Sequence, residues 1–174
     1  MNGTKSVWHS VCLNDWLTYP TVMRLSIVSG LLGLAVLAAV PVQAQPRRNA
    51  APQGTLTAAA APAAIAVRAG GSDRNAVPGS GCSGFINNAQ PSATVQFSGD
   101  GPLAIYVTSD TDTTLLVADP AGRWHCSDDA NGSNPAVTFS RGSAGAYTVW
   151  VGTFSPDAAP AAARVHAVQG QPVW

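Results

Sequence analysis

The sequence predicts an all-β fold, a jelly-roll-like antiparallel β-sandwich of about seven to eight strands. Short β-prone segments recur through the C-terminal half of the 174-residue chain. Turns rich in Gly, Pro, Asp and Asn separate these segments. No part of residues 80–174 repeats apolar residues at helical spacing. Together these three observations favour two packed sheets.

Seven segments are rich in β-branched and aromatic residues, as strands are. In residues 103–108, Leu, Ile and Val alternate with Ala, Tyr and Thr, and residues 146–153 alternate similarly. The tetrapeptide DPAG, which begins at Asp119, places Pro early and Gly late, as a type I turn between strands prefers. The expected strands are residues 93–98, 103–108, 113–118, 122–127, 136–140, 146–153 and 162–168.

Residues 1–44 are predicted to be a signal peptide. Residues 25–40 are apolar, Arg24 precedes them, and small residues up to Ala44 suit a cleavage site. The apolar run is shorter than the roughly 18–20 residues of a spanning helix, so no stable span is expected after cleavage. An uncleaved anchor is the alternative. Met23 offers a second start, which makes residues 1–22 a candidate for a mis-called start.

Two further segments follow the predicted signal peptide. Residues 45–79 are rich in Ala, Pro and Gly and contain few large apolar residues, which predicts a flexible linker. Residues 80–174 form the predicted domain, where seven Asp and three Arg give a formal charge of −4. Nucleic-acid binding is excluded, because it requires a basic surface.

The predicted domain holds two cysteines, Cys82 and Cys126. An even number in an exported chain indicates a disulfide. The loop that it would close is worth about 4 kcal/mol in the chain-entropy model. Free thiols or a metal-binding pair are the alternatives, although two cysteines alone make a poor zinc site.

Acidic residues concentrate between residues 110 and 134, and all nine in the chain are Asp. Carboxylate, amide and carbonyl oxygens are the ligands that Ca²⁺ prefers. The alternative is that these side chains only cap turns through Asx hydrogen bonds. The candidate metal ligands are Asp110, Asp112, Asp128, Asp129 and Asn131.

Three aromatic residues form a candidate ligand platform: Trp124, Trp150 and Tyr106. The alternative for all three is packing in the core. Catalysis is not expected. The only histidines of residues 80–174 are His125 and His166, no G-x-S-x-G elbow is present, and zinc-protease chemistry of the H-E-x-x-H type needs a Glu that the chain lacks.

The order of motifs DTDTTLLVADPAGRWHCSDDANGSNP and then GAYTVWVGT resembles the bacterial pre-peptidase C-terminal family. The resemblance covers about residues 82–169. It implies a jelly-roll sandwich that accompanies secreted proteases and helps secretion, folding or substrate attachment; related collagen-binding modules bind calcium. No protease domain is present in this chain, so that auxiliary role does not transfer directly.

We therefore expect a secreted or periplasmic, monomeric and non-catalytic module. It would bind an extracellular protein or polysaccharide, with Ca²⁺ stabilising the Asp-rich loops. One alternative is a structural or secretion-assisting envelope protein without a specific ligand. Another is a small hydrolase or protease accessory protein.

Overall fold

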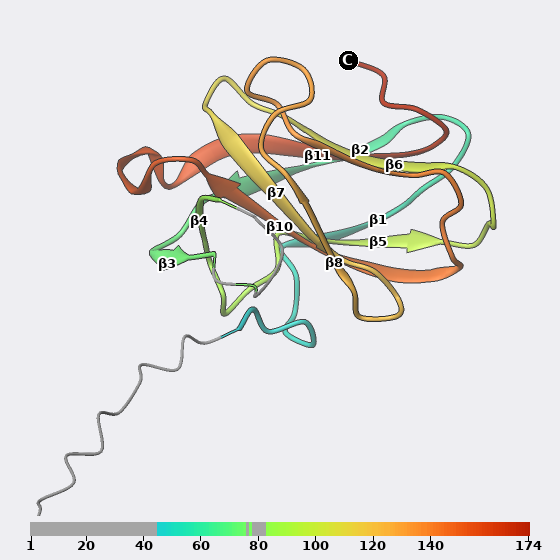
Figure 1. Ribbon diagram of the computed structural model, residues 1–174, viewed down its shortest axis with the longest axis horizontal. Helices are drawn as coiled ribbons and strands as arrows, with labels where there is room; N and C mark the ends of the chain where they lie inside the picture. Colours follow the sequence, from blue (N-terminus) through green and yellow to red (C-terminus); the bar gives the residue numbers. More distant parts are fainter. Residues whose placement is uncertain (1–44, 76, 78–82) are drawn as a thin grey trace, which may run out of the picture. The chain divides into compact units, whose positions relative to one another are not determined.

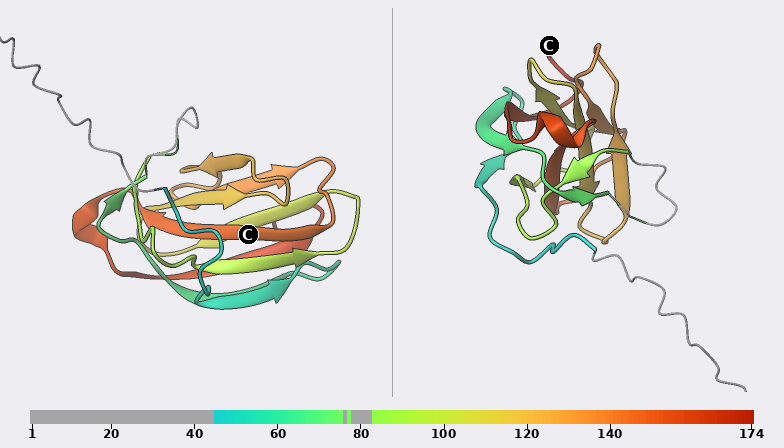
Figure 2. Two further views of the ribbon diagram at one scale, coloured as in Figure 1. Left: turned by 90° about the horizontal axis from the view of Figure 1, so that it is seen from below. Right: turned by 90° about the vertical axis from the view of Figure 1, so that its left-hand side faces the viewer.

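Two β-sheets packed face to face make up the fold of this computed structural model, which describes residues 45–75, 77 and 83–174 (Figures 1 and 2). The larger sheet contains β1 (Gly54–Thr57), β5 (Ala93–Phe97), β10 (Gly145–Thr153), β7 (Thr113–Ala118), β8 (Trp124–Ser127), β4 (Phe85–Ile86) and β3 (Asp73–Arg74). The smaller sheet contains β2 (Ala63–Ala69), β11 (Ala161–Gln169), β6 (Leu103–Thr108) and β9 (Ala136–Phe139). A 3-10 turn, η1 (Pro156–Ala158), precedes β11.

Strand β10 is the centre of the larger sheet. One edge pairs with β5, where Tyr147 lies opposite Val95, and the other pairs with β7, where Val151 lies opposite Leu115. In the smaller sheet β11 lies between β2 and β6. All of these pairings are antiparallel, whereas β1 runs parallel to β5.

The core lies between the two sheets, where the inward side chains of each strand meet. From the larger sheet come Val95, Val149 and Val117, and from the smaller sheet Ile105 and Val165, all 0% exposed. Burial of this kind stabilises by about 1.5–3 kcal/mol for each Val, Leu or Ile side chain. The alternation of the strands therefore gives the sandwich its interior.

All seven predicted strands are present, as β5 to β11, with ends within two residues of the expected ones. The predicted turn at Asp119 is also confirmed. The N–H of Gly122 donates to the carbonyl oxygen of Asp119 at 2.8 Å, and Gly122 has a φ of +83°. A side chain there would be strained in that left-handed conformation, so glycine is the suitable residue.

The prediction of a flexible linker over residues 45–79 is wrong for the part that the structure describes. This part contains β1, β2 and β3, so the described fold has eleven strands. Strand β2 is Ala-rich, but its backbone pairs with β11 over seven residues, and Val67 and Ala69 enter the core. Backbone hydrogen bonds and two inward side chains suffice for an edge strand, which composition alone does not reveal.

Gln53 joins the two sheets at this edge. Its side-chain Nε2 donates to the carbonyl oxygen of Arg68 at 3.0 Å, and the N–H of Arg68 donates to its Oε1 at 2.7 Å. The amide thus pairs with β2 as another strand would.

Within the described residues no helix is long and apolar enough to cross a membrane. The predicted signal peptide, residues 1–44, lies outside the described residues.

Candidate functional site

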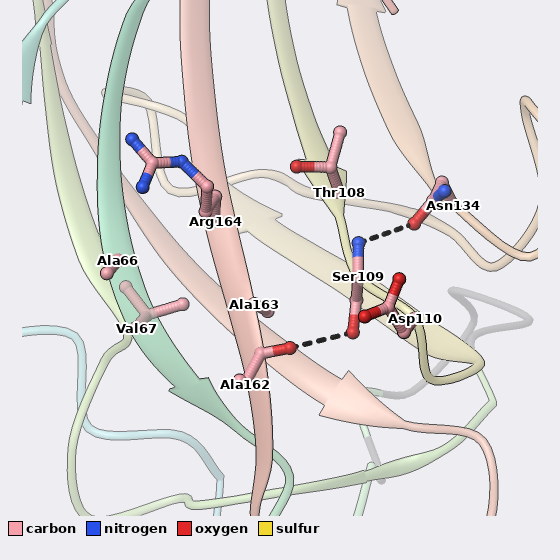
Figure 3. Close-up of a pocket in the computed structure, with 9 residues that line it drawn as sticks. All are labelled: Ala66, Val67, Thr108, Ser109, Asp110, Asn134, Ala162, Ala163 and Arg164. Atoms are coloured by element: carbon pink, nitrogen blue, oxygen red, sulfur yellow. Dashed lines mark hydrogen bonds between the residues drawn. The ribbon is translucent and has the colours of Figure 1, made fainter.

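A groove of about 480 Å³ lies at the end of the smaller sheet, where β6 ends and β11 begins (Figure 3). Thr108 ends β6 and faces Arg164 of β11 in the strand register. Ser109 and Asp110 follow Thr108. The lining residues are Ala66, Val67, Thr108, Ser109, Asp110, Asn134, Ala162, Ala163 and Arg164.

Ser109 fixes the rim of this groove through three hydrogen bonds. Its N–H donates to Oδ1 of Asn134 at 2.9 Å, and its hydroxyl donates to the carbonyl oxygen of Ala162 at 2.8 Å. The same hydroxyl accepts from the N–H of Thr111 at 3.1 Å. These bonds join the loop after β6 to β11 and to the loop before β9, so the groove is preformed.

Two opposite charges stand at this groove. Asp110 and Arg164 are both exposed, and Figure 3 shows them apart, on different sides of the lining residues. The two side chains make no ion pair with each other, and the ion pairs of the described residues involve neither of them. Both charges are thus available to a ligand.

The predicted metal ligands do not all lie together: Asp112 lies near Asp128 and Asp129, whereas Asp110 lies at the groove. Partial burial raises the pKa of Asp112, and the nearby carboxylates of Asp129 and Asp128 raise it further. Asp110 instead lies at the groove. Asn131 forms a tight backbone turn with Asn134. Among the described residues, no three His, Cys, Asp or Glu side chains gather as a metal site requires.

The three predicted ligand-binding aromatics do not form one exposed platform. Trp150 is 0% exposed and Tyr106 is 1% exposed. Trp124 packs on Trp150 at a ring-centroid distance of 5.5 Å, on the outer face of the larger sheet. Tyr106 lies in a separate cluster of the smaller sheet. The platform prediction is therefore wrong, and the packing alternative describes Trp150 and Tyr106. Val77 and Ile86 pack with Trp150, and Val173 and Trp174 contact Tyr106.

Asp119 has a structural role that goes beyond its turn. Asp119 is only 6% exposed, and its carboxylate accepts hydrogen bonds from the backbone N–H of Arg123 at 2.9 Å and from the Nε of Arg123 at 2.8 Å. His125 Nε2 lies 3.2 Å from the same carboxylate. Burial alone would raise the pKa of Asp119, but these hydrogen bonds outweigh it and hold the pKa below its ordinary value. In the sequence, the contacts of Asp119 with Arg123 and His125 correspond to the pattern D-P-x-G-R-x-H across one hairpin.

Both histidines of the domain make internal contacts. His125 also packs edge-on against Phe139 at 4.8 Å. His166 stacks on Tyr106 at 4.7 Å, and its Nε2 lies 2.9 Å from Oγ1 of Thr108. Burial lowers the pKa of His166, and the positive charge of Arg164 lowers it further.

Cys126 is disulfide-bonded, and its side chain packs against the cluster that contains Trp150. The predicted partner, Cys82, lies outside the described residues. The pairing of these two cysteines therefore stays a prediction.

No protein-family model matches the chain, and no curated protein matches it either. Among solved structures, it is similar to the lysozyme inhibitor PliG of Aeromonas hydrophila, a periplasmic inhibitor of g-type lysozyme. The TM-score is 0.36 at 11% identity, with 68% of this chain and 97% of that chain covered. At this identity a likeness indicates neither a shared activity nor a shared partner.

The chain is also similar to a domain of a Bacillus anthracis collagenase. The TM-score is 0.42 at 11% identity, with 67% of this chain and 95% of that chain covered. That domain is a pre-peptidase C-terminal domain, the family that the order of motifs in this chain resembles.

Proposed function

We propose that this chain is an exported, non-catalytic β-sandwich module that binds an extracellular protein or polysaccharide in the groove at the end of the smaller sheet. One observation carries the proposal: a preformed groove that leaves the charges of Asp110 and Arg164 unpaired. Concave sites with a few fixed polar groups are typical of ligand binding. The guanidinium of Arg164 offers a planar set of donors, and Asp110 offers acceptors.

Export supports an extracellular partner. The apolar run of residues 25–40, preceded by Arg24 and followed by small residues, has the pattern of a secretory signal. A disulfide at Cys126 suits an oxidising compartment. The formal charge of −4 over residues 80–174 favours a partner other than nucleic acid.

Retention of the protein on insoluble peptidoglycan, chitin and gelatin tests this proposal. We expect the intact protein to be retained on at least one solid, and Arg164→Ala to weaken retention about tenfold, the effect of losing roughly 1.4 kcal/mol of binding energy. Arg141→Ala is the matched control, since Arg141 is also exposed but does not line the groove. Equal retention of both variants would place binding elsewhere, and retention on no solid would favour a structural role without a ligand.

A small hydrolase is the second candidate, because the contact of His166 with the hydroxyl of Thr108 at the groove has the geometry of a base beside a nucleophile. That role requires turnover of casein or of a glycan by the intact protein, lost in Thr108→Ala. Turnover that persists in Thr108→Ala, or no turnover at all, would remove this candidate.

Calcium is proposed for Asp112, Asp128 and Asp129 alone. Their charges are close enough to raise the pKa of Asp112, so a cation would relieve repulsion. Because the carboxylates do not gather as a side-chain metal site, backbone carbonyls and waters would complete the six to eight oxygens of Ca²⁺. We expect Ca²⁺ at about 100 times its Kd to add about 2.7 kcal/mol, seen as a higher melting temperature that EDTA reverses.

Asp129→Asn should weaken this calcium effect, whereas the matched control Asp100→Asn should keep it. A melting temperature that does not respond to Ca²⁺ in the wild-type protein would eliminate calcium from the account.

A further inference from the structure

Tyr106 is almost completely buried although it lies on the outer face of the smaller sheet. Its neighbours on the core side of β6, Ile105 and Val107, fill the sandwich interior, so Tyr106 points the other way. It is 1% exposed because other groups cover it. On one side His166 stacks on its ring at 4.7 Å and 11°. We call the pair of Tyr106 and His166 the aromatic shelf.

The last two residues of the chain contact this shelf. The Tyr106 hydroxyl donates to the carbonyl oxygen of Val173 at 2.8 Å, and the Trp174 ring packs edge-on against the Tyr106 ring at 5.1 Å and 66°. Figure 1 shows the C-terminal segment folded back over the layer that contains β11 and β6. The tail thus places one backbone carbonyl and one aromatic ring on the shelf.

Within the shelf Tyr106 is buried and His166 is half-buried, whereas the tail is exposed. Val173 is 60% exposed and Trp174 is 48% exposed. Docking of the tail therefore buries only about half of the Trp174 side chain, about 100 Å², and the ordering of its backbone opposes docking. Because so small an area holds the tail, a ligand that buries more of its ring can displace it.

The shelf also adjoins the groove. Nε2 of His166 lies 2.9 Å from Oγ1 of Thr108, and Thr108 lines the groove and faces Arg164. Tyr106 and Thr108 are two residues apart on one strand, which separates them by about 7 Å. A single extended ligand therefore can reach both the shelf and the charges of Asp110 and Arg164.

We propose that the aromatic shelf is a subsite for an aromatic side chain on an extended peptide segment of a protein partner, and that Val173 and Trp174 occupy this subsite in the free protein. The proposal rests on the groove as the binding site and narrows its partner to a protein. Val173 and Trp174 show which groups the subsite binds: a backbone carbonyl that accepts a hydrogen bond from the Tyr106 hydroxyl, followed by an aromatic ring. A polysaccharide offers no aromatic ring of this kind.

The test uses the fluorescently labelled peptide Gly-Gln-Pro-Val-Trp, the sequence of residues 170–174, added to the full-length protein. In the wild type, the tethered tail competes at an effective concentration in the millimolar range. We therefore expect Trp174→Ala, which keeps the tail but removes its ring, to bind the peptide about tenfold more tightly than the wild type. Fluorescence anisotropy measures the difference.

Phe154→Ala is the matched control. Phe154 is 53% exposed, close to the value of Trp174, but its ring has no contact with the shelf. This variant should bind the peptide as the wild type does, and a peptide ending in Ala instead of Trp should not bind Trp174→Ala. Equal affinity of the wild type, Trp174→Ala and Phe154→Ala for the peptide would overturn the proposal. So would a folded Trp174→Ala variant that does not bind the peptide.

A second measurement covers the case in which Trp174→Ala does not fold. Unlabelled peptide at saturating concentration should move the NMR resonance of the Trp174 indole N–H in the wild type to its position in a free peptide. An unmoved resonance would contradict displacement. If the protein binds the peptide but is retained on none of the three solids, the groove is contradicted and the shelf is not. If the protein is retained on a solid but does not bind the peptide, the shelf is contradicted and the groove is not.

Discussion

Trp150→Ala should lower the free energy of unfolding by about 3–5 kcal/mol, the cost of a large cavity in a packed interior. Trp150 is 0% exposed and lies among Trp124, Ile86 and Leu116 on the outer side of the larger sheet. Urea unfolding followed by circular dichroism measures the change. The reason is that Trp150 is the largest fully buried side chain and packs at the centre of this outer cluster.

The control is Phe154→Ala, just after the end of the same strand. Its side chain is 53% exposed, so the free energy of unfolding should change by no more than about 0.5 kcal/mol. If Trp150→Ala instead leaves stability unchanged and abolishes partner binding, Trp150 is a ligand contact and the packing of the larger sheet is not as described.

Asp119→Ala should lower the free energy of unfolding by about 1–3 kcal/mol at neutral pH, because it leaves the part-buried backbone N–H of Arg123 without its acceptor. The contact with His125 is lost as well. The side-chain bond from Arg123 adds little, since the Arg123 side chain is 71% exposed. Urea unfolding at pH 7 measures the total.

Asp119→Asn separates the charge from the shape. The pKa of Asp119 is lower in the folded protein than its ordinary value of 3.8. Its contribution to stability is therefore present above that ordinary value and is lost as the pH falls through the folded pKa. The difference in stability between the wild type and Asp119→Asn should shrink as the pH falls below about 4. A difference that stays constant down to pH 2 would contradict this electrostatic role.

Local sequence determined most of the predicted strands. Segments such as residues 103–108 and 146–153 combine β-branched residues with strict alternation, and turn residues mark their ends. Strands β1 and β2 lack this signal, because β1 is only four residues long and β2 is rich in Ala. Pairing with β5 and β11, distant in sequence, forms them, and a single sequence does not show such long-range pairing.

The candidate site was less predictable for the same reason. Asp110 and Asp112 are neighbours in sequence, but β6 and β7 belong to different sheets, and the chain crosses between the sheets at these residues. Asp110 stays at the groove, while Asp112 lies near Asp128 and Asp129. The groove itself depends on the register of Thr108 with Arg164, which lie 56 positions apart.

The central claim is that a partner binds in the groove of the smaller sheet, and an NMR titration tests it most directly. Soluble fragments of whichever polymer retains the protein are added to the ¹⁵N-labelled full-length chain. The account predicts the largest shifts at Thr108, Ser109, Asp110, Asn134 and Arg164, with smaller ones at Tyr106 and His166. Shifts confined to the Trp124 face of the larger sheet, or to the loop around Phe154, would contradict it.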